Sequence, residues 1–529
     1  MIQKYKNTIF VGLGLISCVA LAVFYATAYP AHLLWQEQNQ VFLNSRDWIS
    51  NYFDKPAWLG CLLGDWLTQF YLYTWVGAAI LTLAIALCVA GLAAVLLRLL
   101  PKAVAWILTA LCAVLLVGCS MPATTQLSFF LCVAGGIGLG LAEFRLYWKE
   151  TVNIDLSPLL VGVAYWMFGF GALLTASIII LLAVKRLVSK QDVRTWWITA
   201  ACATAISMGL PAILCKGYAL PYAKALLYPG IAKPELPQMK YERRLAISDA
   251  FYRRDYTVAK QLVERDENPD EISAFYYYLS SAVQDSLPDN LLKYPVKSLG
   301  TLTTIGETTP PIIINMMNDL YYELGDMTYA ERAAMMRNVF SPRNRNVRMI
   351  RRLAEINLVS GDTAAAMKYL RILDRTYAYG KWSQSHRPGS MAPEVESDIL
   401  SRRIRSNAKD NIRLGDNCRN IILELLESNP GNTVALDYLL CTDLLLKDMD
   451  TFKMDYDTYC MAKGQPRYKD LYQQALMIYL AGTDAPQEEW ERYIVPGAQL
   501  QAFRAYSARR GDPSFGNTYW YYFDRYNNS

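Results

Sequence analysis

The stretch TWVGAAILTLAIALCVAGLAAVLL, residues 74–97, decides the fold class. It is 24 residues long and holds no charged side chain, and about 20 apolar residues cross the roughly 30 Å bilayer core as a helix. Comparable apolar runs occur at residues 9–29, 103–120, 126–142, 157–184 and 196–215. We therefore predict an all-α protein in which residues 1–215 form a polytopic bundle of six or seven transmembrane segments.

The run at residues 157–184 leaves two alternatives open. As one helix its 28 residues would be about 42 Å long, which exceeds the bilayer core. As a pair of short helices hinged near Gly169-Phe170-Gly171, it would return the chain to the side it came from. We favour the pair, because it keeps the basic loop Lys185–Arg194 in the cytoplasm, as the positive-inside rule requires.

Charge is distributed unevenly along the chain. Residues 1–240 carry 16 Lys and Arg against 9 Asp and Glu, whereas residues 241–529 carry 36 against 38. Lys4 and Lys6 place the N-terminus inside, and seven segments then place the C-terminal half outside. We expect a multi-pass protein of the bacterial inner (cytoplasmic) membrane with a periplasmic C-terminal domain. The slightly acidic second half argues against nucleic acid as a partner.

The second half is expected to be a soluble stack of helices. Prolines mark residues 216–240 as a linker, and residues 241–529 show helical stretches separated by short turns. In Leu353–Leu373 small and large residues fall where a tetratricopeptide repeat places them, and Ala250–Val263 is a weaker copy. We predict a tetratricopeptide-like solenoid, a fold whose concave surface usually binds a protein partner.

The loop at residues 31–73 is more than a connection. Its apolar residues recur at roughly helical spacing, so we predict two amphipathic helices on the outer membrane surface, separated at Pro56. It is also rich in aromatic residues of the membrane–water boundary and in carboxylates: Trp35, Trp48, Trp58, Trp66 and Tyr71, and Glu37, Asp47, Asp54 and Asp65. The charges either serve chemistry at the boundary or only solvate the surface helices.

Motifs in this loop resemble those of GT-C-type glycosyltransferases, membrane enzymes that use polyprenyl-phosphate-linked sugars. They are Gln36-Glu37, Arg46-Asp47-Trp48, Phe53-Asp54-Lys55-Pro56 and Trp58. The resemblance implies that Glu37 and Asp54 are catalytic carboxylates and that Lys55 contacts the donor phosphate. The family's usual catalytic Asp would fall at Gln36, which cannot act as a base, so Glu37 or Asp54 would have to replace it.

Two functions therefore compete. One is a GT-C-like glycosyltransferase with a lipid-linked donor, and the other is a non-catalytic membrane scaffold that recruits partner proteins through its helical repeats. The whole chain also resembles a Bacteroidota-type family of multi-pass membrane proteins with C-terminal tetratricopeptide-like repeats. The whole chain has two His and 11 Cys, and the three Cys of the second half lack CxxC spacing. We therefore predict no metal site, and the sequence assigns no cofactor.

Small residues in the run at 126–142 predict close helix packing. Gly136 and Gly140 have the GxxxG spacing that lets two helices approach in a membrane. The neighbouring glycines resemble a phosphate-binding loop only superficially, because no Lys-Ser or Lys-Thr pair follows them. We therefore expect a packing role for this stretch.

Overall fold

The chain is helical throughout the part described by the structure, a computed structural model. Described are all residues except 1, 149–156, 189–192, 296–298, 300–308, 342–343, 407–417, 465, 495–496 and 526–529. No strand occurs among the described residues. The prediction of an all-α protein is thus confirmed for this part of the chain.

The chain divides into two compact units. The first unit holds residues 1–242 together with two short segments from far along the sequence, 345–347 and 372–381. The second unit holds residues 243–344, 348–371 and 382–529.

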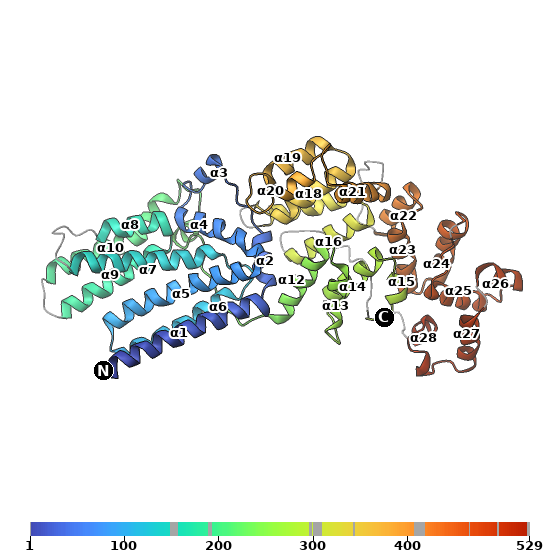
Figure 1. The fold of residues 1–529 in the computed structure, drawn as a ribbon, viewed down its shortest axis with the longest axis horizontal. Coiled ribbons are helices and arrows are strands. Elements are labelled where there is room, and N and C mark those ends of the chain that lie inside the picture. The colour runs from blue at the N-terminus through green and yellow to red at the C-terminus, as the bar shows by residue number, and fades with distance from the viewer. Residues whose placement is uncertain are drawn as a thin grey trace. The chain divides into compact units, whose positions relative to one another are not determined.

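The first unit is a bundle of apolar helices with short helices at one end (Figure 1). Helices α5 and α6, α5 and α7, and α7 and α9 lie side by side, and α1 packs on α5. The helices of this unit are α1 (Ile2–Thr27), α2 (Ala31–Gln38), α3 (Arg46–Ser50), α4 (Trp58–Thr68), η1 (Gln69–Leu72), α5 (Thr74–Leu99), α6 (Lys102–Ser120), α7 (Leu127–Trp148), α8 (Ser157–Phe168), α9 (Gly171–Val188), α10 (Val193–Leu214) and α11 (Tyr222–Leu226).

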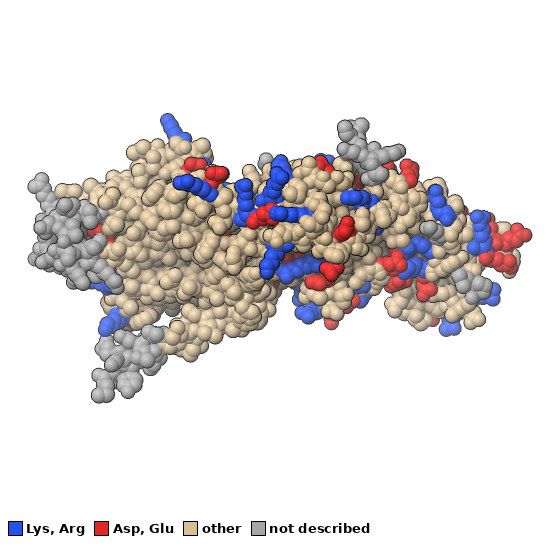
Figure 2. Space-filling view, turned by 45° about the horizontal axis from the view of Figure 1, so that its top comes forward, with Lys and Arg blue, Asp and Glu red and all other residues tan. Residues whose placement is uncertain are grey.

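Three helices of the described chain are long and apolar enough to cross a membrane. They are α5, α6 and the part of α10 from Trp197 to Leu214. Helices α1 and α2 make a fourth candidate if the two, bent by 71°, are taken together. Shorter apolar helices lie at Leu127–Glu143, Ser157–Phe168 and Gly171–Lys185. The face of the bundle that Figure 2 shows carries few charged side chains, a composition typical of a surface that contacts lipid.

The run at residues 157–184 is broken at the expected place. Helix α8 ends at Phe168 and α9 begins at Gly171. Gly169 between them has φ +56°, a left-handed conformation that favours glycine. A Cβ at this position would also lie 2.1 Å from the carbonyl oxygen of Tyr228. The hinge near Gly169-Phe170-Gly171 is therefore confirmed, whereas the total of six or seven spans stays a prediction.

The glycines of α7 let two helices approach closely. A Cβ on Gly136 would lie 2.3 Å from the carbonyl oxygen of Gly171 in α9, and one on Gly140 would lie 2.8 Å from Ile178. The Thr175 hydroxyl also donates to the Gly136 carbonyl at 2.8 Å. A Cβ on Gly138, by contrast, would meet nothing within 4 Å. The glycine spacing thus serves the contact of α7 with α9.

The second unit is a succession of short helices around one apolar core. Its helices are α12 (Met239–Tyr252, whose first residues belong to the first unit), α13 (Tyr256–Glu264), α14 (Glu271–Val283), α15 (Leu287–Asn290), α16 (Pro311–Leu324), α17 (Met327–Val339), α18 (Val347–Ser360), α19 (Thr363–Leu373), α20 (Gly380–Ser385), α21 (Pro393–Arg405), α22 (Cys418–Ser428), α23 (Thr433–Leu446), α24 (Met449–Tyr456), η3 (Asp457–Met461), α25 (Asp470–Gly482), α26 (Gln487–Tyr493), α27 (Ala498–Ala508), η4 (Pro513–Phe515) and α28 (Tyr519–Arg525).

Buried ion pairs cross the core of this second unit. Asp319 is fully buried and binds Arg348 at 2.7 Å and Arg352 at 3.1 Å. Glu323 accepts from Arg402 at 2.7 Å. Because each of these three arginines has a buried carboxylate beside it, the charges compensate one another.

Candidate functional site

The loop at residues 31–73 and the two distant segments of the first unit form one assembly, which we call the platform. Its members are residues 31–73, 345–347 and 372–381. The Asn44 amide donates to the Arg375 carbonyl at 2.9 Å, and the Asn346 side chain donates to Asn39 at 3.1 Å. The guanidinium of Arg345 lies over the Trp48 ring, 3.7 Å from its centre. The loop is therefore held by residues that follow it by some 300 positions.

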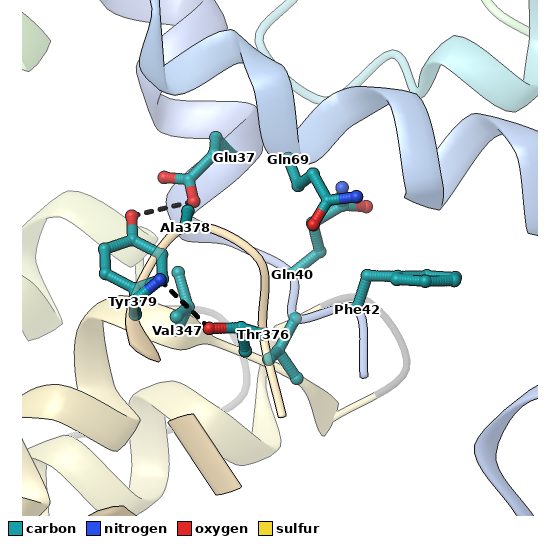
Figure 3. A pocket seen from close by; sticks show the side chains of 9 residues that line it. Glu37, Gln40, Phe42, Gln69, Val347, Thr376, Ala378 and Tyr379 are labelled. Carbon is teal, nitrogen blue, oxygen red and sulfur yellow. Dashed lines mark hydrogen bonds between the residues drawn. The ribbon is translucent and has the colours of Figure 1, made fainter. Parts of the chain in front are cut away.

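Glu37 lies inside this platform and is buried. Its side chain projects from α2 and is 3% exposed. The Tyr379 hydroxyl donates to its Oε1 at 2.7 Å (Figure 3). The cavity beside it, also lined by Gln40 and Gln69, measures about 10 Å³, which is room for about one water molecule. In the structure, Glu37 therefore binds Tyr379.

Asp54 and Lys55 lie elsewhere on the platform. Asp54 is exposed, whereas Lys55 is partly buried and its Nζ donates to the backbone carbonyl of Tyr218. Neither residue lines the cavity beside Glu37. The structure therefore gives the three predicted site residues three different surroundings: a buried tyrosine contact, solvent and a backbone carbonyl.

A second carboxylate of the loop is also engaged internally. Asp65 of α4 is buried and accepts from the Tyr52 hydroxyl at 2.6 Å. Arg345 donates to the same hydroxyl at 3.5 Å. A carboxylate and a tyrosine 13 positions apart form no recognisable motif, so the sequence did not predict this internal contact of Asp65.

Glu242 caps the first helix of the platform. Helix α2 follows Pro30 and has no side-chain cap of its own. The Glu242 carboxylate, in the first turn of α12, accepts from the amides of Ala31 and His32, the latter at 3.0 Å. Burial raises the pKa of Glu242 to about 7, against the effect of the two amides, which favour the charged form. The carboxyl thus titrates near neutral pH.

A larger cavity lies where α6 turns into α7. It measures about 330 Å³ and is lined by the turn Pro122–Gln126, by the first turn of α7 and by residues 229–235. The sequence suggested only a linker for residues 216–240. In the structure this segment is bound to the bundle, because the Glu235 amide donates to Gly118 at 3.0 Å and the Tyr228 carbonyl accepts from Phe170 at 2.9 Å.

Metal-binding geometry does not occur in the described part of the chain. Among the described residues no group of three or more His, Cys, Asp and Glu is arranged to hold a metal ion. The two histidines instead contact their own surroundings: His32 Nδ1 lies 2.6 Å from the Tyr29 carbonyl, and the His386 ring stacks on Trp382 at 3.8 Å.

Comparison with known proteins identifies a family. The profile of a family described as "Family of unknown function (DUF6057)" matches residues 4–525. No curated protein and no solved structure matches the chain. Because the match covers both units, the family profile describes the two units together.

Proposed function

The chain belongs to this family of unknown function (DUF6057), and from its geometry we propose that it is a non-catalytic membrane scaffold. In this proposal the first unit is anchored in the inner membrane of a bacterial cell with six or seven spans, and the second unit recruits a protein partner on the periplasmic side. The buried Glu37–Tyr379 contact is the observation that carries the proposal.

A catalytic carboxylate must reach the group that it deprotonates, directly or through one water. Glu37 is 3% exposed and its neighbouring cavity holds about one water. Lys55, the residue proposed to hold the donor phosphate, already donates to a backbone carbonyl. The loop charges therefore support a role in holding the platform together.

The distribution of charge supports the proposed orientation. Arg98, Lys102 and Lys185 gather at one end of the bundle, where the Lys185 side chain donates to the Arg98 carbonyl. Exposed Tyr73 and Trp75 lie at the opposite end, at the start of α5. Basic residues mark the cytoplasmic end and aromatic residues the boundary, so the platform would face the periplasm.

The second unit supports the recruiting role. Gly361 ends α18 with φ +86°, and the fully buried Ala366 lets α19 pack closely, as in a tetratricopeptide-like helix pair. Exposed apolar residues occur one helical turn apart on two helices: Met335 and Val339 on α17, and Leu400 and Ile404 on α21. Apolar surface of this kind suits a protein partner.

Site-specific photo-crosslinking in intact cells tests the scaffold. A crosslinker at Leu400 or Ile404 should give a discrete product with the same partner, whereas one at the exposed, charged Lys368 should not. Asp54→Asn should leave the product unchanged, because Asp54 is exposed and contacts no partner in the described structure. Equal labelling at all three positions, without a discrete product, would contradict the proposal.

A GT-C-like glycosyltransferase is the second candidate. The observation that favours it is the 330 Å³ cavity, in whose lining a cation, Lys233, and a carboxylate, Glu235, occur together. Transfer of a labelled sugar from a polyprenyl-phosphate donor by the purified chain, abolished by Glu235→Gln, would replace the scaffold proposal with this one.

A further inference from the structure

The 330 Å³ cavity beside α6 and α7 has fixed walls. The turn Pro122–Gln126 forms one wall and residues 229–235 form the other. The second wall is held to α6, where Glu235 donates its amide to the Gly118 carbonyl at 3.0 Å. A Cβ on Gly118 would lie 3.0 Å from Pro234, so glycine permits this close approach. The cavity falls within the size range of small-molecule sites.

Two opposite charges line this cavity without neutralising each other. Lys233 and Glu235 are both exposed and both belong to the lining. No ion pair joins them among the described residues, where Glu235 instead accepts from the Gln238 side chain at 2.7 Å. A cavity with a separate cation and anion is complementary to a ligand that carries one charge of each sign.

The wall formed by α7 is suited to the anionic part of such a ligand. Helix α7 begins at Leu127, and Ser128 and Phe129 of its first turn line the cavity. The Phe129 amide already donates to the Gln126 carbonyl at 3.1 Å, so this turn contributes mainly the positive end of the helix dipole, which favours an anion. Thr125 beside them is 8% exposed, and no hydrogen bond of the described structure uses its hydroxyl. A hydroxyl without a partner, on a largely buried residue of the cavity lining, is available to a polar ligand.

With α6 as a membrane span, the cavity would lie at the level of the lipid headgroups. Helix α6, a candidate span, ends at Ser120, two residues before the cavity wall begins. Gly64 of α4 packs against Ser128, so that a Cβ there would lie 2.8 Å away. Trp66, two residues further along α4, is exposed, as boundary aromatic residues are.

We propose that this cavity binds a phosphoethanolamine group. The phosphate is held by the first turn of α7, the Thr125 hydroxyl and Lys233, and the ammonium is held by Glu235. The group is either the headgroup of a membrane lipid or the free compound. The inference does not depend on the scaffold proposal.

Native mass spectrometry of the full chain, purified in detergent, tests this site. Phosphatidylethanolamine should bind at least tenfold more tightly than phosphatidylcholine, whose ammonium cannot donate a hydrogen bond, and than anionic phosphatidylglycerol. Glu235→Gln should remove this preference. Lys233→Gln should weaken the binding of every phospholipid by about tenfold, the usual effect of losing one charge-assisted hydrogen bond. The control Lys224→Gln changes an exposed lysine of α11 outside the cavity and should change nothing.

Two further experiments distinguish a lipid headgroup from free phosphoethanolamine and control for a variant that does not fold. Free phosphoethanolamine that displaces the lipid at similar concentration would identify the soluble compound as the ligand, and failure to displace it would identify the lipid. Thr125→Val, which keeps the shape of the side chain, should weaken phosphatidylethanolamine binding even if a charge variant does not fold. Equal binding of the three lipids, unchanged in all variants, would overturn the proposal.

Discussion

At the scale of single residues, Glu242 couples the stability of the platform to pH. Its pKa is about 7 in the folded chain, against an ordinary value of 4.5. Between these two values the folded state therefore binds more protons than the unfolded state. The stabilisation that Glu242 contributes to the folded state is fully present below about pH 4.5, and it is lost as the pH rises through 7.

We accordingly expect the melting temperature of the purified chain to fall between pH 5 and pH 7.5. The slope from Glu242 is at most about 1.4 kcal/mol per pH unit. Glu242→Gln keeps the shape and one of the two acceptor oxygens that bind the Ala31 and His32 amides, and it cannot titrate. Its melting temperature should vary less with pH, and identical pH profiles for the two proteins would refute this role.

Tyr379 offers a second prediction at this scale. Tyr379→Phe removes the hydroxyl that donates to Glu37 and leaves a buried carboxylate with one bond fewer. We expect a loss of about 1–3 kcal/mol in stability, measured as a lower melting temperature, and faster proteolysis within residues 372–381. Tyr377→Phe is the matched control, because Tyr377 is 72% exposed and only its ring contacts Phe70. Equal behaviour of the two variants would contradict the role given to Glu37.

At the scale of elements, the contact of α7 with α9 depends on two glycines and not on the third. Gly136→Ala and Gly140→Ala each insert a methyl group where atoms of α9 already lie within 2.8 Å, and overpacking typically costs about 1–3 kcal/mol. Gly138→Ala meets nothing within 4 Å and should be neutral or slightly stabilising. Thermal unfolding in detergent compares the three variants. Destabilisation by Gly138→Ala of the same size would refute this packing.

The sequence could predict these elements because their signals are local. The GxxxG spacing of Gly136 and Gly140, and the hinge near Gly169, depend only on nearby backbone and small side chains. Long apolar runs likewise predicted α5 and α6 within a few residues of their ends. The surroundings of Glu37 were not predictable in this way, because its partner Tyr379 is 342 positions distant. The prolines of residues 229–235 similarly suggested a linker, whereas backbone hydrogen bonds to the bundle hold this segment in place.

At the scale of the whole molecule, topology is the main prediction. Arg98, Lys102 and Lys185 lie at one end of the bundle, while Lys190 of the predicted cytoplasmic loop lies outside the described residues. A reporter fused after Ser529 should be active only outside the cytoplasm. A second fusion after Leu100, in the turn between α5 and α6, should be active only inside. A C-terminal reporter active in the cytoplasm would refute the seven-span arrangement.

The two segments 345–347 and 372–381 have a consequence for the biogenesis of the protein. The ribosome completes Glu37 and Asn39 more than 300 residues before it completes Asn346 and Tyr379. At about 5–20 residues per second, the nascent chain waits on the order of tens of seconds before these partners exist. The apolar helices α5 and α6 can enter the bilayer during that time, but the platform cannot close. The part of the first unit that is among the earliest to be translated is therefore the last to reach its native structure.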